Sequence, residues 1–479
     1  MAPAEDDGRF CNRCNHRAWF ESVLARLLQS GNHIKPSFQL QKPAFRIPDA
    51  MAQAAAFFKA GKLQEAEQLY RAVLAAEPNN ALANNNIGLI ALRVGRSDIA
   101  LELFTKAVAA SPAMSSLHVN LGEACRNLGK LAEAEEAYRK ALELNANDGY
   151  AWGNLGALLQ SRNQLDDASH ALRRAVQIRP DNSEARMALA QILVARNQPN
   201  EALQQLDAAA KLAHLPGFPL AKLGKIYARA NEPEKARKHL QAALVQDPGD
   251  SDGAAVMLAT LDGGAAPARA SDAHMKKLYA ERALSWDQGS EAEHAYRGML
   301  LVEQELRRHA TGKLAILDAG CGTGLVGARI KDLAVQLDGV DLSVHMLQKA
   351  QQKTVYHGLF AGDLLEFMRQ KPASYDAIVA AATLIHFGAL DAVFQLAAGA
   401  LKPGGLFIFT VFPNNDADTW SLTASRELAE GGCYTHGENY LRRTAGQSGF
   451  EVAHLAREVH EYHDAKPVDG FIVSLRKHA

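Results

Sequence analysis

The residues with the clearest chemical potential lie in the segment AILDAGCGTGLVGARI at 315–330. A short apolar strand is expected to end at Asp318, and a glycine-rich turn follows before a helix begins. Gly320, Gly322 and Gly324 carry no side chain, so a ligand can approach the carboxyl end of that strand. Open α/β sheets bind their ligands in the crevice outside this edge. The segment therefore predicts a ligand site built from a strand, a turn and a helix.

Two further acids stand at the ends of the next apolar runs. Asp341 ends the run LDGVD, where its carboxylate can accept hydrogen bonds from both hydroxyls of a ribose. Asp363 ends the run LFAGD, where it can accept a hydrogen bond from the amino group of an adenine. Together the two acids predict a ligand with hydroxyl and amino groups that lies along the carboxyl ends of the strands.

This ordered set of motifs resembles the class I S-adenosylmethionine-dependent methyltransferases across residues 275–479, with YDAIVAAATLIHF and LKPGGLFIF as later strands. The resemblance implies a Rossmann-like domain with a seven-stranded sheet and S-adenosylmethionine as cofactor. It also implies a donor-binding set in the turn, at the ends of the strands and before the first strand. That set is Asp318, Gly320, Gly322, Gly324, Asp341, Leu342, Met346, Asp363, Leu364 and Tyr279.

The glycine turn has two other interpretations. A tight loop without a ligand would not need the acids that follow it. A nicotinamide dinucleotide site would carry the spacing G-x-G-x-x-G with an acid about 20 residues further on. Here the spacing is G-x-G-x-G, and Gly327 fills the later position by the wrong count. Asp318, which precedes the first glycine, also favours the methyl donor.

The catalytic residues are harder to predict, because methyl transfer mainly requires alignment of nucleophile, methyl and sulfur. A base helps where the acceptor is a hydroxyl or a carboxylic acid. His386, in TLIHFGAL, is the candidate base; the alternative is a loop histidine bonded to backbone. Tyr434, His436 and Arg457 are candidates for the acceptor pocket, with surface roles as the alternative. Some relatives that methylate nitrogen carry a D/N-P-P-Y-type motif, which is absent here. A nitrogen of adenine, cytosine or glutamine is therefore not the expected acceptor.

The cysteines predict no further chemistry. Cys433 lacks a matched histidine, so it is expected to be inert. Cys11 and Cys14 stand near His16 and His33 at a spacing that hints at zinc. No second C-x-x-C completes a tetrahedral site, so no metal is expected. Residues 1–46 are predicted to be an irregular leader.

The segment 47–250 repeats itself every 34 residues. An alanine of the buried type recurs at Ala66, Ala100, Ala134, Ala168, Ala202 and Ala236. Small residues in the preceding helix keep this spacing at Gly88, Gly122, Gly156, Ala190 and Gly224. Turn residues keep it at Gly61, Gly95, Gly129, Asn163, Asn197 and Asn231. Small residues let neighbouring helices approach, and Gly or Asn permits a left-handed turn at a helix end.

These units resemble the tetratricopeptide repeat, as in AWGNLGALLQSRNQLDDASHALRRAVQIRPDN at 151–182. One unit cannot bury its own apolar face, so the units are expected to stack into an all-α superhelix over 47–261, including a closing helix. The resemblance implies a groove for a peptide or protein partner. Residues 262–274, rich in Gly, Ala and Pro, are predicted to be a linker.

Composition sets the broad class. Hydrophobic residues make up 48% and charged residues 22%, with a formal net charge of -1. Neither sign is in excess, so no nucleic-acid partner is expected. No run of about 18 apolar residues predicts a membrane span. The start MAPAEDDGRF does not resemble a signal peptide, and the five cysteines form no evident disulfide framework, so a cytoplasmic protein is expected.

The whole architecture resembles a bacterial-type family of predicted methyltransferases that carry tetratricopeptide repeats. The resemblance implies methyl transfer from S-adenosylmethionine to a protein, carrier-bound or small-molecule acceptor that the sequence does not identify. The alternative of a different class is an interaction scaffold with an inactive or regulatory methyltransferase domain. The retained acids Asp318, Asp341 and Asp363 argue against that alternative, since an inactive domain need not keep a donor site.

Overall fold

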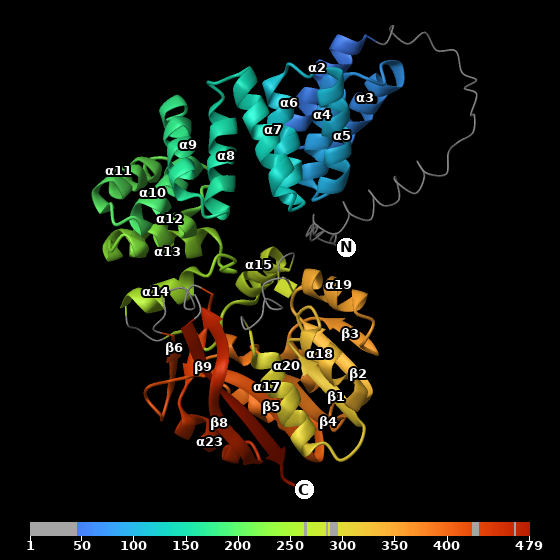
Figure 1. Ribbon diagram of the computed structural model, residues 1–479, viewed down its shortest axis with the longest axis vertical. Helices are drawn as coiled ribbons and strands as arrows, with labels where there is room; N and C mark the ends of the chain where they lie inside the picture. The colour runs from blue at the N-terminus through green and yellow to red at the C-terminus, as the bar shows by residue number, and fades with distance from the viewer. Residues whose placement is uncertain (1–45, 263–265, 284–285, 288–295, 424–430, 464–465) are drawn as a thin grey trace, which may run out of the picture. The chain divides into compact units, whose positions relative to one another are not determined.

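The computed structural model describes residues 46–262, 266–283, 286–287, 296–423, 431–463 and 466–479 (Figure 1). The chain divides into two compact units, Met1–Ala209 and Ala210–Ala479. Among the described residues, no helix combines the length and the apolar character that a bilayer crossing requires.

The first unit is a succession of antiparallel helix pairs. The helices are α2 (Ile47–Lys59), α3 (Leu63–Ala76), α4 (Ala81–Arg93), α5 (Ser97–Ala110), α6 (Ser115–Asn127), α7 (Leu131–Leu144), α8 (Gly149–Ser161), α9 (Leu165–Ile178), α10 (Ser183–Ala195) and α11 (Pro199–Ala210). Each pair is one 34-residue unit, so the predicted all-α repeat architecture is confirmed.

Small residues hold each pair together, as their spacing predicts. The repeated alanines of the second helices, such as Ala134, are completely buried. The glycines of the first helices lie against large side chains of the partner helix. A Cβ atom on Gly88 would stand 2.5 Å from Cε1 of Phe104, and one on Gly122 would stand 2.6 Å from Cε1 of Tyr138. The helices can therefore pack this closely only where a side chain is missing.

The turns between paired helices have the predicted left-handed backbone. Gly95 has φ of +78° and Gly129 has φ of +73°. Asn163 and Asn197 take the same role in later repeats, with φ of +59° and +56°. Glycine has no Cβ to clash in this region, and asparagine is among the few other residues that tolerate it.

The second unit opens with the sixth repeat-like pair and continues into an α/β domain. Its helices are α12 (Leu220–Arg229), α13 (Pro233–Gln246), α14 (Ala254–Asp262), α15 (Asp272–Arg282), α17 (Gly298–His309), α18 (Leu325–Ile330), α19 (Val344–Gln352), α20 (Leu364–Arg369), α21 (Asp391–Ala400) and α23 (Glu438–Gln447), with short 3-10 helices η1 (Lys331–Leu333) and η2 (Leu384–His386). Its strands are β1 (Leu314–Ala319), β2 (Ala334–Asp341), β3 (Gly358–Ala361), β4 (Tyr375–Ala380), β5 (Leu401–Pro413), β6 (Trp420–Leu422), β7 (Tyr434–His436), β8 (Phe450–His463) and β9 (Lys466–Lys477).

The main sheet has the strand order β3-β2-β1-β4-β5-β9-β8. The first five strands are parallel, and β9 runs antiparallel to β5. The short strands β6 and β7 form an additional pair that joins the end of β5. The seven strands of the main sheet confirm the predicted Rossmann-like fold class.

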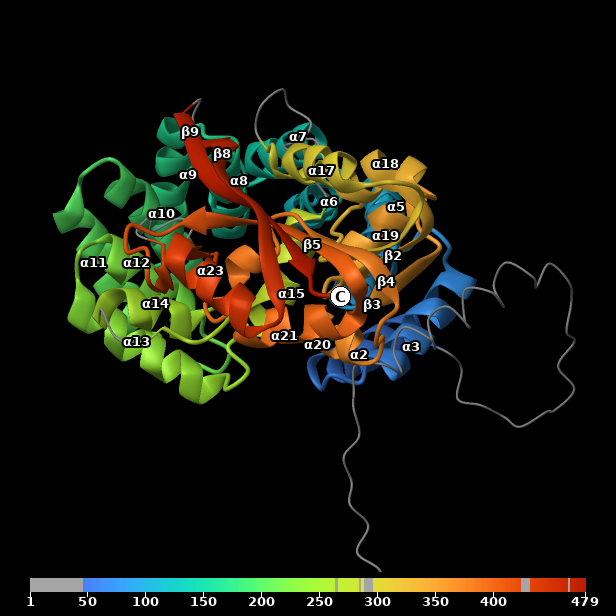
Figure 2. The same ribbon diagram turned by 90° about the horizontal axis from the view of Figure 1, so that it is seen from below.

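Helices cover both faces of this sheet. One apolar cluster joins α20, α21 and α23 to one face, around Phe394, Phe407 and Leu441. A second cluster joins α17 and α18 to the other face, around Val302 and Ile316. Figure 2 shows α17 and α18 on one side of the strands and α20 and α21 on the other. With both faces covered, the carboxyl edge of the parallel strands is the open place for a ligand.

The predicted linker at 262–274 is not a free tether in its described part. The backbone N–H of Gly388 donates to the carbonyl of Ala268 at 2.8 Å, and the N–H of Ala270 donates to the carbonyl of His386 at 3.1 Å. The division between the two units falls within α11, well before this segment. Gly, Ala and Pro in the sequence indicate the lack of a regular period, but they do not exclude backbone pairing with a distant loop.

The close packing of the repeats generates a prediction about stability. Gly122→Val should destabilise the first unit by about 1–3 kcal/mol, because a Cβ atom and two methyl groups must enter the space of the Tyr138 ring. Ala157→Val, on the exposed face of α8, is the matched control and should cost no more than about 0.7 kcal/mol of helix propensity. Urea unfolding followed by circular dichroism measures both, and equal losses would contradict the packing argument.

Candidate functional site

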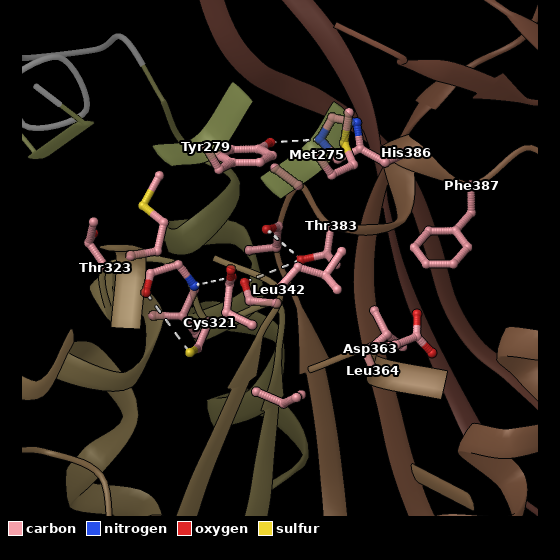
Figure 3. Close-up of a pocket in the computed structure, with 18 of the residues that line it drawn as sticks. Met275, Tyr279, Cys321, Thr323, Leu342, Asp363, Leu364, Thr383, His386 and Phe387 are labelled. Atoms are coloured by element: carbon pink, nitrogen blue, oxygen red, sulfur yellow. Dashed lines mark hydrogen bonds between the residues drawn. The ribbon is translucent and has the colours of Figure 1, made fainter. Parts of the chain in front are cut away.

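A cavity opens at the carboxyl edge of the parallel strands (Figure 3). Its wall combines the turn after β1, the ends of β2 and β3, the loop after β4, and residues in and before α15. Most of the predicted donor-binding residues line it, although they come from distant parts of the sequence. Those residues are Tyr279, Gly320, Gly322, Asp341, Leu342, Met346, Asp363 and Leu364.

The glycine turn presents bare backbone to this cavity. Gly320, Gly322 and Gly324 have φ of +80°, +54° and +87°, a region that favours glycine. A Cβ atom on Gly320 would stand 2.2 Å from Oγ1 of Thr383. A Cβ atom on Gly322 would have no atom within 4 Å. Gly324 is the residue before α18 and does not line the cavity. The turn therefore needs glycine for its backbone at all three positions and for close approach at the first.

Asp341 joins this turn to the start of α19, the helix after β2. Its Oδ2 accepts a hydrogen bond from the N–H of Gly322 at 2.9 Å, and its Oδ1 accepts one from the N–H of Ser343 at 2.8 Å. Burial raises the pKa of the Asp341 carboxyl above its ordinary value, although both hydrogen bonds oppose the shift. A carboxylate has about four acceptor positions, so Asp341 keeps capacity for hydroxyl groups in the cavity.

Asp363 lies across the cavity from Thr323, beside Leu364 (Figure 3). Its Oδ1 caps α20 by accepting from the N–H of Glu366 at 3.0 Å. Its Oδ2 accepts a hydrogen bond from Nη1 of Arg269 at 2.7 Å. The sequence did not indicate Arg269, because it falls in the segment predicted to be a linker.

Asp318 lies behind the turn rather than in the cavity wall. It is 1% exposed, and its Oδ2 accepts a hydrogen bond from the hydroxyl of Tyr356 at 2.7 Å. Burial raises the pKa of Asp318 to about 7, against the opposing effect of the Tyr356 hydrogen bond. Tyr356 was not predicted as a site residue. A Cβ atom on Gly327 would stand 2.3 Å from the Tyr356 hydroxyl. This glycine, in the helix after the turn, therefore makes room for Tyr356.

Tyr279 and His386 face each other at one end of the cavity (Figure 3). The Tyr279 hydroxyl lies 2.6 Å from Nε2 of His386, and Nδ1 of His386 lies 3.2 Å from the carbonyl oxygen of Gly432. A carbonyl only accepts, so Nδ1 carries the proton and Nε2 accepts from the tyrosine. Burial lowers the pKa of His386 to about 4, so the imidazole is neutral near pH 7.

The three candidate acceptor residues are placed elsewhere. Tyr434 is buried, and its hydroxyl donates to the carbonyl of Pro267 at 2.7 Å. His436 is also buried, and its Nε2 bonds to backbone carbonyls of the loop after β4. Arg457 is an exposed residue of β8 that pairs with Asp469 at 2.9 Å. None of the three lines the cavity, because β7 turns its side chains into packing contacts and β8 carries Arg457 on its outer side.

The cysteines near the cavity are not placed for nucleophilic chemistry. Burial raises the pKa of the Cys433 thiol to about 12, so it remains protonated and is a poor nucleophile near pH 7. Cys11, Cys14, His16 and His33 lie outside the described residues. Within the described ranges, no group of three or more His, Cys, Asp or Glu side chains has the arrangement of a metal site.

Comparison with known proteins identifies both parts of the chain. Residues 316–405 match a family of methyltransferase domains. Tetratricopeptide-repeat families match residues 51–96, 85–149, 137–168 and 159–216. The chain therefore carries a methyltransferase domain behind tetratricopeptide repeats, as the motifs predict.

Curated proteins with similar sequences match part of this chain. The chain is 31% identical over 115 residues to the ubiquinone biosynthesis O-methyltransferase of Idiomarina loihiensis, covering 22% of this chain and 45% of that protein. It is 27% identical over 191 residues to the malonyl-(acyl-carrier protein) O-methyltransferase of Priestia megaterium, covering 38% of this chain and 65% of that protein. The chain thus spans between about half and two thirds of the length of these curated relatives.

Among solved structures, magnesium protoporphyrin IX methyltransferase from Synechocystis PCC 6803 with bound SAM aligns with a TM-score of 0.33 at 17% identity. That alignment covers 43% of this chain and 96% of the other.

The buried acid behind the turn generates a prediction about pH. The folded-state pKa of Asp318 lies above its unfolded value, so its ionisation opposes folding as pH rises from about 4 to 7. Asp318→Asn cannot ionise, and its oxygen can still accept from Tyr356. The variant should gain stability over the wild type by about 1.4 kcal/mol for each pH unit between pH 5 and 7.

Scanning calorimetry of both proteins at pH 5 and pH 8 measures this difference. The midpoint of the variant should rise relative to the wild type by at least about 5 °C between the two pH values. A constant difference would show that Asp318 is already ionised in the folded protein at pH 5.

Proposed function

We propose that this chain transfers a methyl group from S-adenosylmethionine to an oxygen acceptor, with the repeats recruiting the acceptor or a partner. The proposal rests on the position of one cavity within the matched domain. The stretch matched as a methyltransferase domain, 316–405, contributes the turn, Asp341 and Asp363 to one cavity at the carboxyl edge of the sheet. An adenosine-containing cation fits this arrangement of bare backbone and carboxylates.

The residues present fit such a donor. Asp341 would hold the ribose hydroxyls, and Asp363 with Leu364 would hold the adenine. The turn at Gly322 leaves open space where a side chain would stand, which suits the methionine half of the donor, with Asp318 behind it. When bound, the donor supplies a methyl group that is already activated on a sulfonium. The protein therefore has to align the acceptor and accept its proton.

Tyr279 and His386 are placed to accept that proton. The Tyr279 oxygen donates its own proton to Nε2 of His386, so its lone pairs remain available to an acceptor hydroxyl in the cavity. When the acceptor hydroxyl is methylated, its proton would pass to the Tyr279 oxygen, and the tyrosine proton would pass to Nε2 of His386. Tyr279, expected to bind the donor, thereby takes a second role. The similar proteins from Idiomarina and Priestia are both named O-methyltransferases, which supports an oxygen acceptor.

The repeats would supply recruitment. Arrays of this kind commonly form concave surfaces for peptides and proteins. In the first unit, the amide of Asn120 donates to that of Asn85 at 2.7 Å, and Asn85 donates to Asn86 at 3.2 Å. Asn85 is buried and links the half-buried amides of Asn86 and Asn120, and amides both donate and accept, so these two would suit the backbone of an extended peptide. A protein or a carrier-bound acceptor fits this array better than a free small molecule.

Donor binding can be measured without knowing the acceptor. Calorimetry of the full chain should show binding of S-adenosylhomocysteine. Asp341→Ala should weaken it by about ten- to a hundredfold, because a hydrogen bond to a charged group contributes about 1.5–3 kcal/mol. Asp376→Asn is the matched control: this carboxylate also accepts from backbone, the N–H of Ala315 at 2.8 Å, but does not line the cavity. The affinity of Asp376→Asn for S-adenosylhomocysteine should stay within about twofold of the wild-type value. A wild type without binding would instead favour the interaction scaffold with an inactive domain.

The proposed proton path gives a second expected outcome. Incubation of the full chain with methyl-labelled donor and a cell extract should yield labelled methyl esters or ethers by mass spectrometry. Tyr279→Phe and His386→Gln should each slow labelling by about a hundredfold at saturating donor, the usual contribution of a positioned base. Because the pKa of His386 is about 4, wild-type labelling should not fall between pH 7.5 and pH 5.5. A loss of rate near pH 6.5 would show a solvated histidine base instead, and full activity in His386→Gln would exclude this proton path.

A further inference from the structure

The geometry assigns Arg269 as a positioning residue of the donor site: it fixes the carboxylate that reads the adenine and thereby sets selectivity for that base. The inference rests on the proposed function, since it concerns how the same cavity holds its donor. Arg269 lies in the segment before α15, outside the stretch matched as a methyltransferase domain.

The guanidinium of Arg269 joins two carboxylates. Nη1 bonds to Oδ2 of Asp363 at 2.7 Å, and Nη2 bonds to Oδ1 of Asp272 at 2.9 Å. Arg269 and Asp272 both line the cavity, and the guanidinium carbon lies 5.9 Å from the centre of the Phe387 ring. The planar fork of arginine can bind two acceptors at once, whereas the ammonium of lysine acts as a single point charge.

Arg269 completes the fixation of Asp363. One oxygen of Asp363 is already held by the N–H of Glu366 at the start of α20. With Arg269 on the other oxygen, the carboxylate plane cannot rotate without breaking a charged hydrogen bond. Its remaining lone pairs then keep one direction, which is the condition for reading an amino group rather than a carbonyl on the base.

The backbone of Arg269 is held as firmly as its side chain. It forms an isolated antiparallel bridge with Phe387, in the loop after β4. The preceding carbonyl, of Ala268, accepts from the N–H groups of Gly388 at 2.8 Å and Ala389 at 3.1 Å. Ala270, which follows, is 3% exposed. The arginine therefore projects from a segment that pairs with the loop after β4 and is part of the cavity wall.

The other flank of this segment is fixed by the loop between α13 and α14, at the end of the repeat-like helices. The hydroxyl of Ser271 donates to the carbonyl of Asp250 at 2.7 Å, in the loop between α13 and α14. Lys277 of α15 pairs with Asp252 of the same loop at 2.6 Å. Gly253 has φ of +69°, and a Cβ atom there would stand 2.8 Å from Nε2 of His274. Arg269 is thus held between that loop and the cavity.

The test measures both affinity and base selectivity in the full chain. Calorimetry gives the Kd of S-adenosylhomocysteine and of S-inosylhomocysteine, which carries a carbonyl in place of the adenine amino group. Arg269→Ala should weaken S-adenosylhomocysteine by about tenfold, the value of one charged hydrogen bond. It should also lower the ratio of the two Kd values, which measures the preference for adenine, toward the ratio found for Asp363→Ala. The double variant should lose less binding free energy than the two single variants lose in sum. Arg269→Lys should fall between wild type and Arg269→Ala.

Arg307→Ala is the matched control. Arg307 forms a bidentate pair with Asp332 at 2.8 and 2.9 Å on α17, and neither residue lines the cavity. Both Kd values should stay within about twofold of wild type. An equal loss for both ligands in Arg269→Ala would indicate a merely structural role and overturn the inference. Tighter binding in Arg269→Ala would overturn it as well, since the arginine would then occupy the place of the adenine. Absence of binding by the wild type would overturn the proposed function, whereas wild-type binding with unchanged selectivity in Arg269→Ala overturns this inference alone.

Discussion

The cavity depends on the two hydrogen bonds that the Asp341 carboxylate accepts from backbone. One comes from Gly322, in the turn after β1, and the other from Ser343, at the start of the helix after β2. These bonds hold together two loops that follow neighbouring strands, so the turn keeps its left-handed backbone and stays open to a ligand. Parallel strands bring both loops to one edge, and the carboxylate converts that proximity into a fixed surface.

The same arrangement has an electrostatic consequence. Asp318 is buried and Asp341 is half-buried, and loss of hydration raises the pKa of each carboxyl. The negative charge of Asp341 raises the pKa of Asp318 further. A site of this kind favours a cation, because a positive ligand lowers the cost of ionising both acids. The sulfonium and the ammonium of the proposed donor have the required sign, and the neutral Tyr279–His386 pair adds no competing positive charge.

How much of this could be predicted depended on how local each feature is. The repeats were predictable because Gly122 and Ala134 have their partners within one 34-residue unit, so the spacing alone carries the packing. That Asp341 and Asp363 reach one cavity was predictable because each stands at the end of an apolar run, and parallel strands align those ends. Tyr356 was missed because its role is set by its approach to Asp318 across the sheet. Tyr434, His436 and Arg457 were placed in an acceptor pocket on chain position alone, whereas the pairing of β7 and β8 decides where they point.

The segment before α15 shows the limit of composition most clearly. Glycine, alanine and proline without a regular period indicate only that a stretch forms neither helix nor long strand. They do not indicate whether its N–H and C=O groups pair with water or with protein. Here the carbonyls of Pro267 and Ala268 and the N–H of Ala270 pair with the loop after β4 and with β7. A catalytic domain counted from residue 275 would therefore omit part of its own cavity wall. The repeat-like loop at Asp250 and Asp252 fixes the other flank of that wall, so the last repeat belongs physically to the domain that holds the cavity.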